Sequence, residues 1–414
     1  MKLDAAATPD LCAWLCPGDT VLWGQATAEP LTLTRALVDQ RDRLKRLRLL
    51  LGISLAPTLL PEHADAFDFF SYCGAGSNRD LARAGVLDIL PFAYSQLPDL
   101  MRGGLWKVDA VLVQVSEPDA QGRYSLGLAN DWLIAALQSA RVVIAEVNPG
   151  VPWTHGARTL SSDDIDLAVP ARFAPLEHAP KAASEVETRI AQRVADLIQD
   201  GATLQLGLGG VTDQVLALLG DRRDLGLHSG LVGDALVGLA ESGALTNARK
   251  SIDRGIGIAG ILMGGQRLFE FANHNPALQL RGNEYTHDGA VLRCLDRFVA
   301  INSAIEVDLT GQINAEVAGA DYVGAVGGAP DFMRAAQANR GGLPIIAMPS
   351  SAGARSRIVT QLSGPVTTPR CDAGLIVTEH GVADLRGLSL RMRVQRMLAI
   401  AAPEHQQALE QALP

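Results

Sequence analysis

The sequence predicts an α/β protein that is built from two related open α/β domains with mainly parallel sheets. Short apolar runs of strand length alternate with segments of helical periodicity, which is the pattern of strands joined by helices. The 41 glycines and the low aromatic content of 5% suit many tight strand–helix turns. A chain of 414 residues is also too long for one ordinary domain.

The first half contains three clear strand patterns, each of them short and apolar. The turn Gly18-Asp19-Thr20 leads into the predicted strand at residues 21–24. Further strands are expected at residues 108–115 and 142–146, which read VDAVLVQV and VVIAE.

A domain boundary is expected near residue 180, which divides the chain into domains 1–180 and 181–414. Residues 171–182 carry two prolines and show no periodicity, as is typical of a linker. A helix follows directly, because Ser184 and Glu187 have the spacing of a capping box ahead of an apolar stripe.

The second half repeats the alternation of strands and helices. A strand at residues 202–206 ends in the turn Gly207-Leu208-Gly209-Gly210, and a helical pattern follows at once. The remaining elements are expected as strands at 298–305, 345–348 and 374–378 and as helices at 331–338 and 390–400.

The two halves show similar segments in the same order, which suggests duplication. Residues 18–24 and 200–207 are both a polar turn that leads into a short strand ending in glycine. Residues 108–122 and 298–311 are both a buried strand followed by an acidic turn. Two related domains with ligand sites at strand carboxyl ends are the simplest architecture.

Two glycine-rich turns precede helices, at residues 207–210 and 324–330. Such turns let the backbone approach a phosphate closely and direct free N–H groups toward it. Residues 207–212 lack the third glycine of a dinucleotide fingerprint, and no Gly-Lys-Ser/Thr follows as in a Walker loop. The alternative is that both are ordinary strand–helix turns.

Composition excludes several classes of function. A net charge of −9 argues against nucleic-acid binding, which needs a basic surface. The five cysteines and the histidines show no metal-ligand spacing and no disulfide framework, so we expect no metal and a cytoplasmic protein. No apolar run reaches the ~18 residues of a membrane span, and no signal peptide is recognised.

Ordered motifs occur along nearly the whole chain. They are GQATAEP at 24–30, FAYSQLP at 92–98, AEVN at 145–148, LQLG at 204–207, INSAIEVD at 301–308, VGG at 326–328, AMPS at 347–350, SRIV at 356–359 and VTEHG at 377–381. Together they resemble the acetyl-CoA hydrolase/transferase family of family I CoA-transferases, above all the 4-hydroxybutyrate and butyryl-CoA transferases and also the itaconate CoA-transferases.

The resemblance implies a ping-pong transfer between an acyl-CoA and a small carboxylic acid. A carboxylate attacks the thioester, forms an acyl anhydride and then becomes a glutamyl-CoA thioester. Coenzyme A is thus a substrate, no separate cofactor is implied, and a homodimer or homotetramer is expected. The residues similar to CoA-contacting positions are Gly207, Leu208, Gly209, Gly210, Val211, Ile305, Gly327, Gly328 and Ser350.

The sequence departs from the family where the catalytic glutamate is expected. That glutamate follows a His-Ser or His-Thr pair, but here His228-Ser229 is followed by Gly230. Asp234, four residues on, resembles a structural aspartate of the family.

Three explanations remain for a site without this glutamate. The carboxylate can come from the N-terminal half, with Glu62 and Glu29 as candidates and Glu284 as a weaker one. The protein can instead hydrolyse acyl-CoA, with water in the space of the glutamate and His228 as a base. The third reading is a non-catalytic CoA-binding protein.

Overall fold

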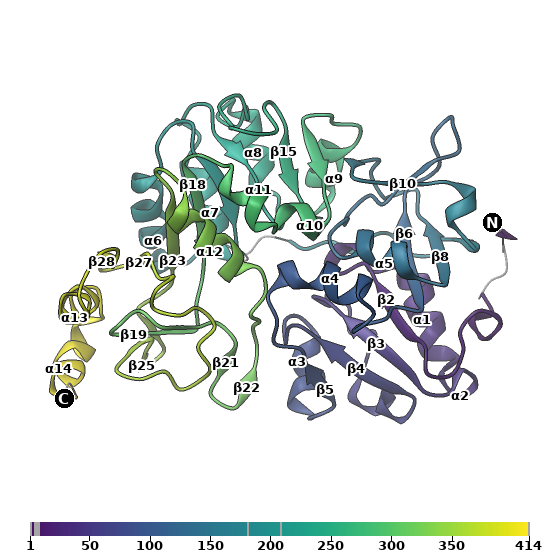
Figure 1. Cartoon of the computed structure of the whole chain (residues 1–414), viewed down its shortest axis with the longest axis horizontal. Coiled ribbons are helices and arrows are strands. Elements are labelled where there is room, and N and C mark those ends of the chain that lie inside the picture. Colours follow the sequence, from purple (N-terminus) through teal and green to yellow (C-terminus); the bar gives the residue numbers. More distant parts are fainter. Residues whose placement is uncertain (1, 4–8, 180–181, 208, 413–414) are drawn as a thin grey trace. The chain divides into compact units, whose positions relative to one another are not determined.

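The chain folds into two compact units (Figure 1), and the computed structural model describes residues 2–3, 9–179, 182–207 and 209–412. The first unit contains Met1–Ala179, Ile258–Thr286 and Asp321–Val323. The second contains Pro180–Gly257, His287–Ala320 and Gly324–Pro414. The first boundary thus falls beside the expected one at residue 180, whereas the segment 258–286 returns to the first unit. Within that unit, β17 (Leu278–Leu280) pairs with β9 (His155–Gly156), a contact that local sequence patterns do not reveal.

The first unit is built on an eight-stranded sheet in the order β1-β11-β8-β6-β2-β3-β4-β5, and every pairing in it is parallel. The strands are β1 (Lys2–Leu3), β2 (Thr20–Trp23), β3 (Leu47–Leu51), β4 (Phe67–Ser71), β5 (Leu87–Ile89), β6 (Ala110–Val115), β8 (Val142–Val147) and β11 (Leu167–Pro170). The helices are α1 (Leu31–Asp39), α2 (Arg41–Leu44), α3 (Asn78–Arg83), α4 (Leu97–Arg102), α5 (Leu133–Ser139), α9 (Gln266–Ala272) and α10 (Asn283–Thr286).

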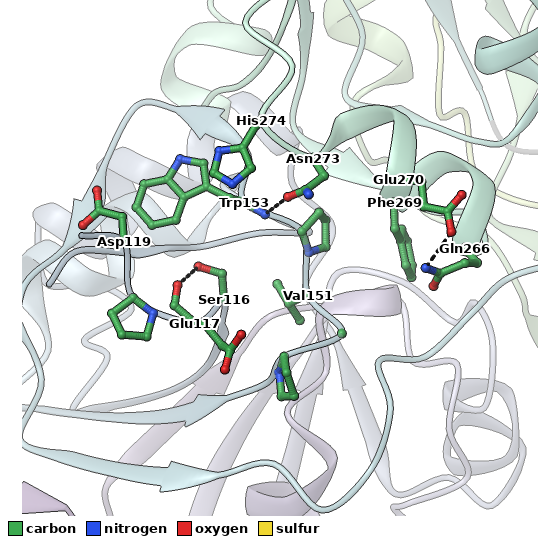
Figure 2. A pocket seen from close by; sticks show the side chains of 14 residues that line it. Ser116, Glu117, Asp119, Val151, Trp153, Gln266, Phe269, Glu270, Asn273 and His274 are labelled. Carbon is green, nitrogen blue, oxygen red and sulfur yellow. Dashed lines mark hydrogen bonds between the residues drawn. The ribbon is translucent and has the colours of Figure 1, made fainter. Parts of the chain in front are cut away.

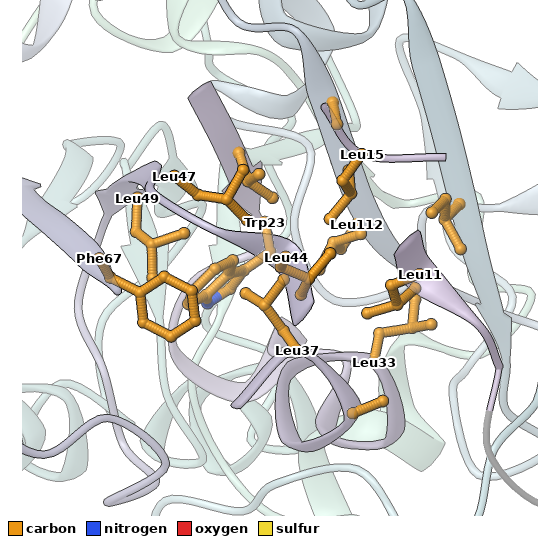
Figure 3. Close-up of a cluster of buried hydrophobic side chains, with 14 of the residues drawn as sticks. Leu11, Leu15, Trp23, Leu33, Leu37, Leu44, Leu47, Leu49, Phe67 and Leu112 are labelled. Carbon is orange, nitrogen blue, oxygen red and sulfur yellow. The ribbon is translucent and has the colours of Figure 1, made fainter. Parts of the chain in front are cut away.

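Helix α1 holds the core of the first unit together with the strands beside it (Figure 3). Its Leu33 and Leu37 are one turn apart on the same face and are completely buried. They belong to the same apolar cluster as Leu49 of β3 and Phe67 of β4. Burying a leucine of this kind stabilises the fold by roughly 1.5–3 kcal/mol. This packing therefore holds α1 against the sheet.

The second unit is built on a six-stranded sheet in the order β13-β12-β18-β23-β27-β28. Its pairings are parallel except for β28, which runs antiparallel to β27. The strands are β12 (Thr203–Leu206), β13 (Gly226–Leu227), β18 (Phe298–Asn302), β23 (Leu343–Ala347), β27 (Leu375–Thr378) and β28 (Gly381–Asp384). The helices are α6 (Glu185–Leu197), α7 (Gly210–Leu218), α8 (Ala235–Glu241), α11 (Gly289–Arg293), α12 (Ala329–Ala338), α13 (Leu390–Ala399) and α14 (Pro403–Gln411).

Short elements complete the two units. Those of the first unit include β7 (Tyr124–Ser125), β10 (Thr159–Leu160) and the 3-10 helices η1 (Leu11–Ala13), η2 (Ala26–Ala28), η3 (Pro61–Asp65), η4 (Tyr94–Gln96) and η5 (Ser162–Asp164). Those of the second include β19 (Glu306–Asp308), β20 (Ile313–Asn314), β24 (Ser351–Ala352), β25 (Arg355–Ser356) and β26 (Ile358–Val359).

The two sheets share one strand order, which confirms the prediction of two related α/β domains with mainly parallel sheets. The first sheet reads β11-β8-β6-β2-β3 where the second reads β27-β23-β18-β12-β13. The similar segments noted in the sequence occupy equivalent strands, because β2 corresponds to β12 and β6 corresponds to β18. β2 pairs with β3 on one side and with β6 on the other, and β12 pairs with β13 and β18 in the same way. The strand order therefore reverses at the same strand in both sheets.

The helix at the start of the second unit also forms as predicted. The side chain of Ser184 accepts a hydrogen bond from the Glu187 N–H at 3.2 Å, and Glu187 accepts from the Ser184 N–H at 2.8 Å. This capping box satisfies two of the free donors at the start of α6. Among the described residues, no helix is both long enough and apolar enough to cross a membrane.

Candidate active site

Polar residues gather at the carboxyl edge of the second sheet, where four neighbouring parallel strands end. The residues that follow β12, β18, β23 and β27 include Gly207, Ser303, Ser350 and Glu379 respectively. The carboxyl ends of parallel strands meet at one edge, and this edge is where open α/β sheets bind ligands. Gly207, Gly209 and Gly210 of the predicted CoA-binding turn thus lie at this edge.

A cavity of about 150 Å³ opens at this edge, beside the beginning of α7. Its lining includes the predicted residues Gly209, Gly210 and Val211. Gly209 has φ +130, a backbone conformation that residues with a side chain rarely adopt. The N–H groups of the first turn of a helix carry a partial positive charge, which favours an anionic group such as a phosphate. The lining also includes the carboxylate of Glu187, which acts in the opposite direction.

Arg357 supplies a cationic side chain to the same cavity. Its Nε donates to the carbonyl oxygen of Ile305 at 2.8 Å, and its guanidinium also donates to the carbonyl of Ala304. Burial lowers the pKa of Arg357, while the nearby Glu379 raises it. An arginine is still protonated under such conditions. Arg357 therefore places a positive charge beside Ile305, which the sequence predicts to contact CoA.

Ser350 fixes a carboxylate beside this group. The N–H and hydroxyl of Ser350 donate to the two oxygens of Glu379 at 2.9 and 2.6 Å. Burial acts to raise the pKa of Glu379, but these hydrogen bonds outweigh it and hold the pKa below the ordinary value. Ser350 is itself fully buried, so in this structure its hydroxyl orients Glu379.

The turn at residues 228–230 lies against the end of β12. The hydroxyl of Ser229 accepts from the Leu206 N–H at 3.1 Å and donates to the carbonyl of Leu231 at 2.8 Å. His228 is fully buried, and its ring packs edge-on to Phe298 with centroids 6.4 Å apart. Asp234 directly precedes α8, at the N-cap position of that helix.

Gly327 and Gly328 lie apart from the lining of the 150 Å³ cavity and directly precede α12. A Cβ atom built on Gly328 would lie 2.6 Å from Cδ2 of His287. The backbone of this turn therefore packs closely against the imidazole ring. Of the remaining predicted CoA residues, Gly207 donates its N–H to the carbonyl of Ile301 at 2.8 Å. Leu208 lies outside the described residues.

Glu29 lies at the carboxyl side of β2, two residues before α1 begins. Its side chain is 2% exposed and accepts hydrogen bonds from the hydroxyls of Thr34 at 3.1 Å and Thr58 at 2.8 Å. Burial raises the pKa of Glu29, although both threonines and Arg35 act in the opposite direction. Thr58 also lines a cavity of about 330 Å³ together with Arg35.

A second buried carboxylate contacts the start of α1. Glu146, near the end of β8, accepts from the N–H groups of Thr32 and Leu33 at the start of α1, at 2.8 and 3.3 Å. Burial raises the pKa of Glu146 to about 7, and the negative charge of Glu29 contributes to this increase. The start of α1 therefore holds two carboxyl groups that resist being ionised together.

The other two carboxylate candidates have different surroundings. Glu62 is exposed on η3, which precedes β4, so it lies ahead of the amino end of that strand. Glu284 is half-buried in α10, and its carboxylate lies 3.6 Å from the guanidinium of Arg102. Burial raises the pKa of Glu284.

The first unit contains a separate cavity of about 380 Å³ beyond the carboxyl ends of β6 and β8 (Figure 2). Trp153 stacks on His274 in its wall, with ring centroids 6.0 Å apart and an angle of 11°. Glu117, Asp119 and Glu270 contribute carboxylates, and no lysine or arginine belongs to its described lining. This charge is unsuited to an anionic carboxylate or phosphate, and the cavity contains no predicted site residue.

Arg357, Glu379 and His287 are site residues that we did not predict from the sequence. Glu379 directly follows a predicted strand. Its position at the carboxyl end of that strand is a signal from which it could have been predicted as a site residue. Arg357 and His287 come from connecting segments whose position only the fold decides. Among the described residues, no group of three histidine, cysteine or acidic side chains could hold a metal ion.

Comparisons with known proteins identify the family to which the chain is similar. Residues 7–170 match the model of the acetyl-CoA hydrolase/transferase N-terminal domain, and residues 264–413 match that of the C-terminal domain. The chain is 36% identical to a 4-hydroxybutyrate coenzyme A transferase of Clostridium kluyveri over 395 residues, covering 94% of this chain and 92% of the relative. It is 32% identical to a butyryl-CoA:acetate CoA-transferase of Anaerostipes caccae, covering 95% and 92%.

Solved structures give the same picture. RipA of Yersinia pestis superimposes with a TM-score of 0.94 at 34% identity, covering 99% of this chain and 96% of that one. A 4-hydroxybutyrate CoA-transferase of Porphyromonas gingivalis superimposes with a TM-score of 0.85 at 32% identity and the same coverage.

Proposed function

The chain belongs to the acetyl-CoA hydrolase/transferase family, and we propose that it is a CoA-transferase acting between an acyl-CoA and a small carboxylic acid. The observation that carries this proposal is the cavity at the start of α7 in the second unit. It combines the start of α7, the glycine turn and Arg357. These groups match the phosphates of coenzyme A, whereas the curated relatives with transferase names supply the reaction class.

The proposed reaction is a ping-pong transfer through an enzyme carboxylate. A carboxylate oxygen attacks the thioester carbonyl, the C–S bond breaks, and an acyl anhydride and a CoA thiolate form. The thiolate then attacks the enzyme's own carbonyl, which releases the first carboxylate and leaves a glutamyl-CoA thioester. The acceptor acid reverses both steps, so no other reactant is consumed.

The carboxylate of this proposal comes from the N-terminal unit, because Gly230 has no side chain to provide it. Of the two candidates we favour Glu29, which follows β2 at the carboxyl edge where reacting groups of α/β sheets gather. Its hydrogen bonds to Thr34 and Thr58 fix its orientation. Glu62 is the alternative, since its exposure on η3 leaves it free to react.

Trapping the covalent intermediate tests the proposal. The protein is incubated with acyl-CoA, reduced with borohydride and digested, and the modified peptide is mapped by mass spectrometry. We expect a reduced Glu29, and we expect Glu29→Gln to lower transfer by roughly 10³-fold or more, as for other removed nucleophiles. The matched controls are Glu62→Gln and Glu117→Gln, the latter exposed on the loop after β6.

Each other outcome points to a different function. A reduced Glu62 moves the reaction to that residue. Release of free CoA without an adduct supports an acyl-CoA hydrolase. Tight CoA binding with neither outcome supports a non-catalytic CoA-binding protein.

The proposal includes the conditions under which the enzyme works. Coenzyme A is bound as a substrate, and no metal or other cofactor takes part. The protein acts in the cytoplasm as a homodimer or homotetramer, without nucleic-acid or membrane partners. Sedimentation of the purified chain tests the oligomeric state directly.

A further inference from the structure

His287 is a buried histidine at the turn where the family resemblance places the catalytic glutamate. It is 4% exposed, directly follows α10 and lies two residues before α11. The neighbouring Asp288 caps that helix, because its carboxylate accepts from the N–H groups of Ala290 and Val291 at 2.8 Å. This cap fixes the backbone from which the imidazole extends.

Gly230 and Gly328 both lie close to the imidazole ring of His287. A Cβ atom built on Gly230 would lie 2.9 Å from Cε1 and 3.0 Å from Nε2 of His287. A Cβ atom on Gly328 would lie 2.6 Å from Cδ2 of the same ring. Real Cβ atoms essentially never approach another atom closer than 3.0 Å, so a side chain at either position requires the ring to move.

The ring has little freedom to move. It packs on Phe332 of α12 with centroids 4.5 Å apart, and Phe332 in turn contacts Phe298 of β18 at 6.2 Å. Both phenylalanines belong to the core of the second unit and are nearly or completely buried. Displacing the imidazole would therefore disturb a close-packed core.

The chemistry of this imidazole does not replace a carboxylate. Burial, followed by the nearby His228, lowers the pKa of His287 to about 3. The ring is neutral at physiological pH and too weak a base to activate water efficiently. The imidazole therefore acts by filling space and not by transferring a proton.

We infer that His287 occupies the space that a side chain at position 230 would need, and that it positions the Gly230 and Gly328 turns of the CoA site. The inference rests on the proposed function only in taking these turns as part of that site. It follows that glycine at 230 and histidine at 287 form a matched pair. A glutamate at position 230 therefore requires the imidazole of His287 to shift.

A double-mutant cycle tests the pairing in the full-length chain. Gly230→Ala, His287→Ala and the double variant are compared by thermal unfolding and by the dissociation constant of CoA. We expect Gly230→Ala to lower the melting temperature and weaken CoA binding. His287→Ala should relieve both effects, with a coupling of about tenfold in the dissociation constant, as found for residues in contact.

Gly220 provides the matched control in the same unit. A Cβ atom there would lie 3.7 Å from Cβ of Ser242, which is an ordinary contact. Gly220→Ala and His287→Ala should therefore be additive. Additivity of Gly230→Ala with His287→Ala in melting temperature would overturn the inference, even in a protein that proved unable to bind CoA.

A second experiment tests whether a glutamate at position 230 can react with acyl-CoA. Gly230→Glu and Gly230→Glu/His287→Ala are incubated with acyl-CoA, reduced with borohydride and mapped. We expect an adduct on residue 230 only in the double variant. An adduct at residue 230 in the single variant would show that the imidazole does not exclude a side chain.

Discussion

The buried carboxyl group of Glu146 makes the stability of the first unit depend on pH. Its side chain is fully buried, and burial raises its pKa from the ordinary 4.5 to about 7. The folded protein therefore keeps this proton over a pH range in which the unfolded chain has lost it. This contribution to stability is complete below pH 4.5 and is lost as the pH rises toward 7.

The replacement Glu146→Gln removes this dependence and keeps an oxygen acceptor for the N–H groups at the start of α1. The difference between the two pKa values corresponds to roughly 3 kcal/mol. Most of it, roughly 2–3 kcal/mol, falls between pH 5 and pH 8. Relative to the wild type, the variant should thus become more stable by about this amount as the pH rises across that interval.

Tryptophan fluorescence in urea is a suitable assay, because all five tryptophans lie in the first unit. Unfolding free energies are measured at pH 5 and pH 8 for the wild type, Glu146→Gln and the exposed control Glu117→Gln. The control should follow the wild type. An equal change between the two pH values in wild type and Glu146→Gln would refute the assignment of a raised pKa to Glu146.

Three further substitutions test the core and the CoA site. Leu49→Ala, which opens a cavity in the completely buried core of the first unit, should cost about 2–5 kcal/mol in the same urea assay, and a loss below about 1 kcal/mol would contradict the packing. Arg357→Ala should weaken CoA binding by roughly tenfold or more in titration calorimetry. The control Arg334→Ala, whose exposed guanidinium pairs with Asp372 at 2.7 Å, should not change that affinity. Gly209→Ala should weaken CoA binding because alanine rarely adopts φ +130, and unchanged affinity would separate this turn from the site.

The sequence determined the strands and helices because their signals are local. The apolar runs at residues 202–206 and 374–378 became β12 and β27, and the spacing of Ser184 and Glu187 produced a capping box. Even the similarity of the two halves was readable, since equivalent patterns came to occupy equivalent strands. The glycine turn before α7 was likewise visible, because only its neighbours in sequence define it.

Only the tertiary structure decided which residues from distant segments meet. Nothing near residue 287 indicates that its imidazole packs against Gly230, and nothing near residue 357 indicates that its guanidinium lines the cavity at α7. The return of segment 258–286 to the first unit is of the same kind, because it depends on pairing with residues more than a hundred positions earlier. Local patterns fix where strands begin and end, whereas burial and close packing decide which side chains share a site.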